Sequence, residues 1–289
     1  MTGFVEIFEV GPRDGLQNEK AAISVADKVR LIDTLSDAGF RRIEVASFVS
    51  PKWVPQMAAS GEVLAAITRK PGVSYAALTP NMRGLDAAIA ARADEVAIFG
   101  SASEGFSKAN INASIAESLE RFAPVAEAAR NAGIPVRGYV SCVVECPYDG
   151  PVAPEATARV VAALRDMGVY EVSLGDTIGQ GRPEAVDAML TAVLDEIPAA
   201  QLAGHFHDTS GRALENIEVA LSHGLRVFDA AVGGLGGCPY APGAAGNVAT
   251  EAVHDRLTAL GYETGLDRDV LNEAANIARD LRAGGNGHG

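Results

Sequence analysis

Two histidines, His205 and His207, stand two residues apart at the end of a run of β-forming residues. Side chains at alternate positions of a β-strand lie on one face, so both imidazoles can face the same space. Asp14, in the distant segment GPRDG, is our candidate for a carboxylate that joins them. Two imidazole nitrogens with one or two oxygens favour Mg²⁺, Mn²⁺ or another borderline divalent ion over a thiolate zinc site. The histidine pair alone is also compatible with two satisfied core histidines.

A glycine-rich run at 233–247 carries Cys238 and ends at Asn247. The run lacks the lysine and Ser/Thr of a phosphate-binding P-loop. We interpret it as a mobile lid that brings one reactive thiol over a site, and the alternative is a plain turn with a buried cysteine.

Cys142 and Cys146 form a CxxxC pair without a second pair, which is weak evidence for a metal, so we interpret them as reduced core or loop residues.

These scattered residues need a fold that brings distant segments together. Eight β-rich runs alternate with segments of helical periodicity, such as Val25, Val29, Ile32 and Leu35 before Gly39. This alternation predicts an α/β fold, namely a (β/α)8 TIM barrel with a C-terminal helical extension. An open doubly wound sheet is the alternative, but no GxGxxG follows the first strand. The predicted strands are 5–10, 42–46, 73–78, 95–99, 136–142, 170–174, 201–207 and 226–232.

Length and composition limit the function classes. We expect one catalytic domain over 1–289, with the barrel at about 4–262, a helix at about 267–282 and a flexible tail at 283–289. With 24 Lys+Arg against 37 Asp+Glu, the formal charge of −13 argues against nucleic-acid or anionic-membrane binding. The apolar runs fall short of the roughly 18 residues that cross a bilayer. Three cysteines and no recognisable leader or peroxisomal address predict a cytoplasmic protein.

Polar residues gather where the predicted strands end, which is the reactive rim of a TIM barrel. Because the eighth strand closes against the first, we expect Asp14 to lie near the histidines of the seventh. The polar residues at this rim are Arg13, Asp14, Glu44, Ser47, Arg137, Tyr139, Asp176, Thr177, His205, His207, Asp208, Cys238 and Asn247.

Six segments carry a joint resemblance: VGPRDGLQNEK (10–20), IEVASFVSPKWVPQM (43–57), RGYVSCV (137–143), SLGDTIG (173–179), HFHDT (205–209) and GLGGCPYAPGAAGN (234–247). In this order they strongly resemble the hydroxymethylglutaryl-CoA lyase family of metal-dependent TIM-barrel lyases with an Arg-Asp motif. The resemblance implies cleavage of 3-hydroxy-3-methylglutaryl-CoA (HMG-CoA) to acetyl-CoA and acetoacetate with Mg²⁺ or Mn²⁺. It also implies coenzyme A as part of the substrate, a homo-oligomer of two or more subunits, and a place in leucine degradation and ketone body metabolism.

The resemblance also implies roles for individual residues. Asp14, His205, His207 and Asn247 match the metal ligands. Arg13 would stabilise the developing enolate, and Cys238 would donate or accept a proton. Glu44 and Asp176 match the remaining active-site carboxylates, and His205, Asp176 or a metal-bound hydroxide would remove the hydroxyl proton. The substrate-binding set is Arg13, Gln17, Ser47 and Tyr139 at the acyl pocket and Asn110 at the coenzyme A arm.

Three other functions remain open at this point. The same chemistry could act on another 3-hydroxyacyl-CoA, such as citramalyl-CoA or a longer-branched thioester. A condensing acyltransferase of the isopropylmalate synthase type would run the carbon–carbon step in the opposite sense, but such chains usually carry an extra C-terminal regulatory domain. A barrel that binds coenzyme A or senses a metal without catalysis is the third.

Overall fold

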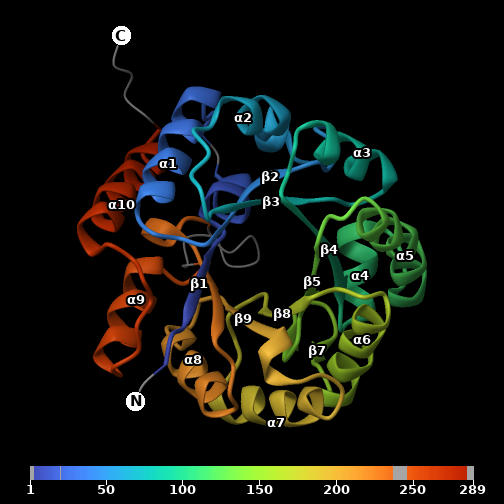
Figure 1. The fold of residues 1–289 in the computed structure, drawn as a ribbon. Coiled ribbons are helices and arrows are strands. Elements are labelled where there is room, and N and C mark those ends of the chain that lie inside the picture. Colours follow the sequence, from blue (N-terminus) through green and yellow to red (C-terminus); the bar gives the residue numbers. More distant parts are fainter. Residues whose placement is uncertain (1–2, 20, 237–245, 285–289) are drawn as a thin grey trace.

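The computed structural model describes residues 3–19, 21–236 and 246–284 and contains eight parallel strands closed into a barrel. The strand order around the barrel is β1-β10-β9-β8-β5-β4-β3-β2, so the first and last barrel strands pair. Figure 1 shows the helices as a ring around these strands. The predicted TIM barrel is confirmed. Its strands are β1 (Glu6–Glu9), β2 (Arg42–Ser47), β3 (Ser74–Leu78), β4 (Glu95–Ser101), β5 (Val136–Ser141), β8 (Glu171–Asp176), β9 (Leu202–Phe206) and β10 (Val227–Ala230).

Helices follow the strands, and several of their ends carry capping residues. Ser114 and Glu117 form a capping box at the start of α5, and Asp267 caps α10. Gly133, just after α5, has φ +73°, a left-handed conformation that glycine adopts at little cost. The helices are α1 (Val25–Asp37), α2 (Ser60–Ala66), α3 (Met82–Ala90), α4 (Glu104–Ile111), α5 (Ile115–Asn131), α6 (Pro154–Asp166), α7 (Pro183–Leu194), α8 (Ala213–Ser222), α9 (Thr250–Ala259) and α10 (Arg268–Arg282).

Two features differ from the sequence expectation. The fifth barrel strand ends at Ser141, because Cys142 has φ +57° and leaves the extended region. A short antiparallel hairpin of β6 (Glu145–Cys146) and β7 (Gly150–Pro151) then precedes α6. Strands of two residues are too short to show the alternation of polar and apolar residues on which the prediction relied.

The C-terminal helix α10 packs along α1 and against the turn Val232–Gly234, with Leu271, Ala274 and Ala278 fully buried. It therefore belongs to the wall of the barrel at the point where β10 leaves the sheet.

Of the predicted tail, residues 285–289 lie outside the described residues. Among the described helices, none combines the length and the apolar character that a bilayer span requires.

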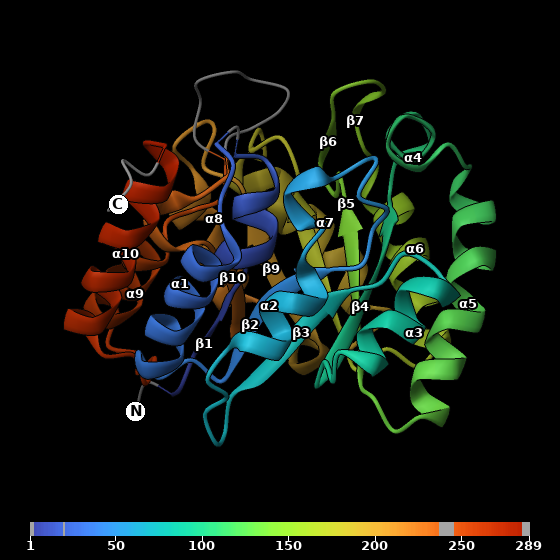
Figure 2. The ribbon, with the colours of Figure 1, turned by 90° about the horizontal axis from the view of Figure 1, so that it is seen from above.

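The carboxyl ends of the strands form the rim that carries the site. In Figure 2 the β6–β7 hairpin and α4 lie together at this end of the barrel. Asp149, in the turn between β6 and β7, connects them, because its carboxylate accepts hydrogen bonds from the Ser103 hydroxyl and the Gly105 amide at 2.7 Å each.

Candidate active site

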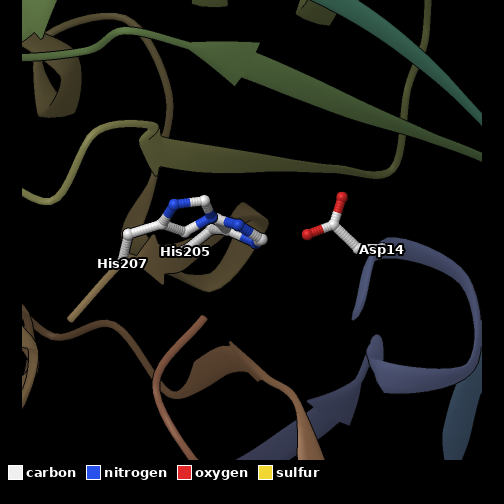
Figure 3. Close-up of side chains that lie close together, drawn as sticks. All are labelled: Asp14, His205 and His207. Atoms are coloured by element: carbon white, nitrogen blue, oxygen red, sulfur yellow. The ribbon is translucent and has the colours of Figure 1, made fainter. Parts of the chain in front are cut away.

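Three side chains that could hold a cation meet at the rim of the barrel. One possible ligand atom from each of Asp14, His205 and His207 lies within 4.8 Å of the other two. Figure 3 shows the carboxylate of Asp14 facing the two imidazole rings. His205 lies in β9 and His207 directly follows that strand, whereas Asp14 comes from the segment after β1. The structure thus brings together three of the four residues proposed as metal ligands.

A tight turn at Gly11–Gly15 places Asp14 over the end of β1. The amides of Arg13, Asp14 and Gly15 all point to the carbonyl oxygen of Val10, at 3.2, 2.7 and 3.2 Å. Gly15 is needed here because a Cβ at this position would come within 2.6 Å of the Cβ of Leu235. The glycines in GPRDG therefore let Arg13 and Asp14 turn back toward the barrel axis.

Asn247, the fourth proposed ligand, is joined to the cluster. Its backbone forms an antiparallel bridge with His207, and its Nδ2 donates hydrogen bonds to Asp14 Oδ2 at 2.8 Å and to the Leu235 carbonyl at 3.3 Å. Because both amide protons are used, Oδ1 of Asn247 is the atom left for a cation. Gln17 also contacts this cluster, donating from Nε2 to Asp14 Oδ1 at 3.0 Å.

Arg13 is a buried cation beside the histidines. Its Nε donates to Glu44 Oε2 at 2.5 Å, and its Nη1 donates to Asp14 Oδ1 at 2.6 Å. The guanidinium carbon lies 5.6 Å from the centre of the Tyr139 ring, and Arg13 is 5% exposed. Burial raises the pKa of Glu44, and the charge of Arg13 partly offsets this. These partners hold the guanidinium in one orientation, as transition-state stabilisation requires.

Two of the three side chains in the cluster, Asp14 and His207, are in the protonation state that ligates a divalent cation. Burial would raise the pKa of Asp14, but the positive charges of Arg13, His205 and His207 lower it overall. Burial and the nearby His205 lower the pKa of His207 to about 4, so this ring is neutral at pH 7. Nδ1 of His207 is buried and has no hydrogen-bond partner in the described part of the chain. Burial would lower the pKa of His205, but its hydrogen bond to Asp229 and the charges of Asp229 and Asp14 raise it overall, so a cation must displace a proton from this ring. An ionised carboxylate and neutral imidazoles are the forms that ligate metals.

Asp176 ends β8 and is fully buried. Burial raises its pKa to about 6, and hydrogen bonds from the Gly181 and Gln180 amides limit the rise. The carboxyl group therefore titrates near neutral pH, which suits a residue that exchanges protons. Its backbone carbonyl also accepts from the His207 amide at 3.4 Å, so this residue adjoins the cluster.

The structure gives less support to three other predicted site residues. Ser47 is buried at the end of β2, and its Oγ accepts from the Val49 amide at 3.4 Å. Asn110 is exposed on α4 and has no hydrogen bond to the other predicted site residues within the described ranges. Cys238 lies outside the described residues. Cys142 and Cys146 are buried free thiols, in agreement with the interpretation as reduced residues.

Two buried carboxylates were missed by sequence reasoning. Asp229, in β10, contacts His205, and Glu9, in β1, connects the loops of the site. The signal was available, because acidic residues are uncommon inside predicted strands and Asp229 stands between Phe228 and Ala230. Arg137 was expected at the rim and received no role, but it is the second residue of β5 and lies buried inside the barrel, away from the carboxyl ends of the strands.

Glu9 connects the chain segments before Asp14 and after Asn247. Its Oε1 accepts from the amides of Gly11 at 2.8 Å and Val232 at 2.9 Å, and its Oε2 accepts from the Thr250 hydroxyl at 2.6 Å. Burial raises the pKa of Glu9 from 4.5 to about 7. The ionised carboxylate therefore costs stability at neutral pH.

We expect Glu9→Gln to stabilise the protein at alkaline pH. The amide keeps an acceptor for the two backbone amides and has no charge to desolvate. The folded wild type holds its proton more tightly than the unfolded chain, so this cost grows from about pH 4.5 to 7 and is complete above it. Urea unfolding at pH 8 should show a gain of up to about 3 kcal/mol, which shrinks as the pH falls toward 4.5. Glu62→Gln, on the exposed face of α2, serves as control, and a lower stability of Glu9→Gln at pH 8 would contradict the expectation.

Comparisons with known proteins agree with the geometry. A family model described as HMGL-like matches residues 4–278. A Pseudomonas aeruginosa protein named 3-hydroxy-3-isohexenylglutaryl-CoA/hydroxy-methylglutaryl-CoA lyase is 59% identical over 93% of this chain and 90% of its own length. Hydroxymethylglutaryl-CoA lyase of Pseudomonas mevalonii is 56% identical over 92% of this chain and 89% of its own. The crystal structure of the Brucella melitensis HMG-CoA lyase is 63% identical with a TM-score of 0.97, covering 97% of this chain and 99% of that chain.

Proposed function

This chain belongs to the HMG-CoA lyase family, and from that premise we propose that it cleaves HMG-CoA to acetyl-CoA and acetoacetate with a divalent cation. The observation that carries the proposal is the meeting of Asp14, His205 and His207 beside the buried guanidinium of Arg13. These residues come from opposite ends of the chain, and their side chains offer the donor set that Mg²⁺ or Mn²⁺ accepts.

We propose that Asp14, His205, His207 and Oδ1 of Asn247 hold the cation. When bound, a divalent cation supplies Lewis-acid chemistry that makes the substrate hydroxyl easier to deprotonate. The fit rests on the 4.8 Å grouping and on the neutral His207. Arg13 and Asn247 hold both oxygens of Asp14 and so orient this carboxylate.

The protein's own residues carry the remaining steps. A base takes the proton of the tertiary hydroxyl, and Asp176 is the candidate whose side chain is not needed to hold the cation. The carbon–carbon bond then breaks, the former hydroxyl carbon becomes the ketone of acetoacetate, and the electron pair moves into the acetyl-CoA enolate. Arg13 faces that enolate oxygen with a guanidinium fixed by Glu44. An acid then protonates the enolate carbon, and we propose Cys238 for this role from the family resemblance.

The substrate-binding residues are proposed on the same basis. Gln17, Ser47 and Tyr139 line the acyl end, and the contact of Gln17 with Asp14 and the stacking of Tyr139 near Arg13 support this placement. Asn110 is proposed to contact the coenzyme A arm, which its exposed position on α4 at the rim allows.

The organisation of the protein is also proposed. The pairing of β1 with β10 supports a single catalytic domain, because the barrel needs both ends of the chain. The buried free thiols Cys142 and Cys146 support a reducing compartment such as the cytoplasm. A homo-oligomer of two or more subunits and a place in leucine degradation and ketone body metabolism follow from the family resemblance.

The test is an assay of the purified protein with HMG-CoA, after EDTA treatment and again after Mg²⁺ or Mn²⁺ is restored. We expect acetoacetate to form only with the cation, because the site has no other Lewis acid. Citramalyl-CoA and 3-hydroxy-3-isohexenylglutaryl-CoA are assayed in parallel, the second because a relative that is 59% identical carries that name. Cleavage that is unaffected by EDTA, or cleavage of one of the other thioesters alone, would overturn the proposal.

A further inference from the structure

The carboxylate of Asp229 accepts four hydrogen bonds inside the barrel. Arg137 donates to both oxygens, from Nη2 to Oδ1 at 2.7 Å and from Nη1 to Oδ2 at 3.1 Å. The Ser173 hydroxyl donates to Oδ2 at 2.7 Å, and Nδ1 of His205 lies 3.1 Å from the same oxygen. Asp229 is 2% exposed and pairs in register with His205 between the parallel strands β10 and β9. Its contact with His205 is therefore set by the sheet itself.

This carboxylate has little freedom to turn away from His205. Arg137, which grips both of its oxygens, is itself held by Glu171 Oε1 at 2.7 Å and by the Tyr139 hydroxyl at 2.9 Å. The ring of Phe8 covers the guanidinium at 4.2 Å. A bidentate arginine fixes the plane of a carboxylate as well as its position. Oδ2 is shared by three donors, since Arg137, Ser173 and His205 all contact it.

The state of Asp229 decides which nitrogen of His205 carries a proton. The guanidinium of Arg137 donates to both oxygens of Asp229, and the Ser173 hydroxyl donates to Oδ2, which is the pattern of an ionised carboxylate paired with an arginine. An ionised carboxylate only accepts hydrogen bonds, so Nδ1 of His205 must be the donor. Neutral His205 then has its lone pair on Nε2, and Figure 3 shows the tips of both imidazoles facing Asp14.

We propose that Asp229, held by Arg137 and Ser173, is a positioning residue that keeps His205 as the Nδ1–H tautomer, with Nε2 presented for cation binding. The inference deepens the proposed function and rests on the proposed cation site. A carboxylate behind a ligating imidazole both orients the ring and raises its basicity. Asp229 thus acts through His205 and touches neither the substrate nor the reacting atoms.

The first test compares the Mn²⁺ affinity of the wild type, Asp229→Asn and Asp187→Asn by electron paramagnetic resonance. An asparagine must turn its NH₂ group either to Arg137 or to His205, so one of the two contacts is lost. We expect Asp229→Asn to bind Mn²⁺ about 10- to 100-fold more weakly. Asp187→Asn is the matched control, since Asp187 also lies against a histidine, 2.7 Å from His223 Nε2, but outside the cluster, and we expect it to keep the wild-type affinity. Equal affinity of wild type and Asp229→Asn would overturn the proposal.

The second test reads the tautomer directly in the metal-free wild type, so it does not depend on the folding of a variant. Long-range ¹H–¹⁵N spectra at pH 9 distinguish a protonated from an unprotonated ring nitrogen. We expect Nδ1–H for His205, whereas His223, whose Nε2 lies 2.7 Å from Asp187, should show Nε2–H and serves as the internal reference. An Nε2–H form of His205 would overturn the proposal. Neither readout uses HMG-CoA, so this result is independent of whether the protein cleaves that substrate.

Discussion

Turnover of HMG-CoA by the Arg13→Gln variant is expected to fall on the order of 10²-fold or more, while the cation is still bound. Arg13 is 5% exposed and is held by Glu44 and Asp14, so its charge acts in a site from which water is largely excluded. Glutamine keeps much of the bulk but cannot stabilise the enolate oxygen as it gains charge. The loss should appear in kcat, because the interaction strengthens only in the transition state.

The measurement is kcat and KM at saturating Mg²⁺, together with a Mn²⁺ titration of the same preparation. Removal of a positive charge next to Asp14 should not weaken cation binding, so retained Mn²⁺ affinity separates catalysis from loss of the metal. Arg69→Gln is the matched control, because Arg69 also pairs with an aspartate, Asp94 at 2.9 Å, but lies on the outside of the barrel. A fall in kcat of less than about tenfold would remove Arg13 from the catalytic residues.

His207→Ala is expected to lower Mn²⁺ affinity strongly and to reduce turnover by about 10³-fold at limiting metal, as the loss of several kcal/mol of Lewis-acid stabilisation implies. His207 is neutral at pH 7 because burial and His205 lower its pKa to about 4, so its lone pair is available without the release of a proton. Alanine leaves Asp14 and His205 without the third side chain of the cluster.

Two readings check this expectation. Mn²⁺ binding reports the affinity, and turnover measured across a range of Mg²⁺ concentrations shows whether excess metal restores activity. His254→Ala is the control, because His254 lies on α9, and its Nδ1 is 2.8 Å from the Thr264 hydroxyl, away from the cluster. Wild-type Mn²⁺ affinity in His207→Ala would show that the cation, if bound, does not use this residue.

The sequence predicted the barrel because its signals are local. Each barrel strand was visible as a short β-rich run, and several of the helices had an apolar spacing of three or four residues and a glycine such as Gly39 at their end. The hairpin β6–β7 was missed because its two-residue strands are formed by their turn and by the contact of Asp149 with the start of α4.

The sequence predicted those parts of the candidate site in which the residue type and its position along a strand indicate the chemistry. The spacing of His205 and His207, and the closure of the barrel next to Asp14, indicated a shared cation site before any geometry was known. The roles of Glu9 and Asp229 could not be read in this way. Glu9 accepts hydrogen bonds from Val232 and Thr250, which lie more than 200 residues further along the chain. These hydrogen bonds form only when β1 and β10 pair.

The sequence by itself therefore determined the eight barrel strands, several of the helices, the rim on which most of the predicted polar residues lie and the family to which the chain belongs. The tertiary structure alone decided which carboxylate stands behind His205 and how the guanidinium of Arg13 is oriented. The physical reason is that alternation along a strand is a property of neighbouring residues, whereas the pairing of Asp229 with His205 depends on the register between two strands. A shift of that register by one residue would turn Asp229 out of the barrel and leave every local signal unchanged.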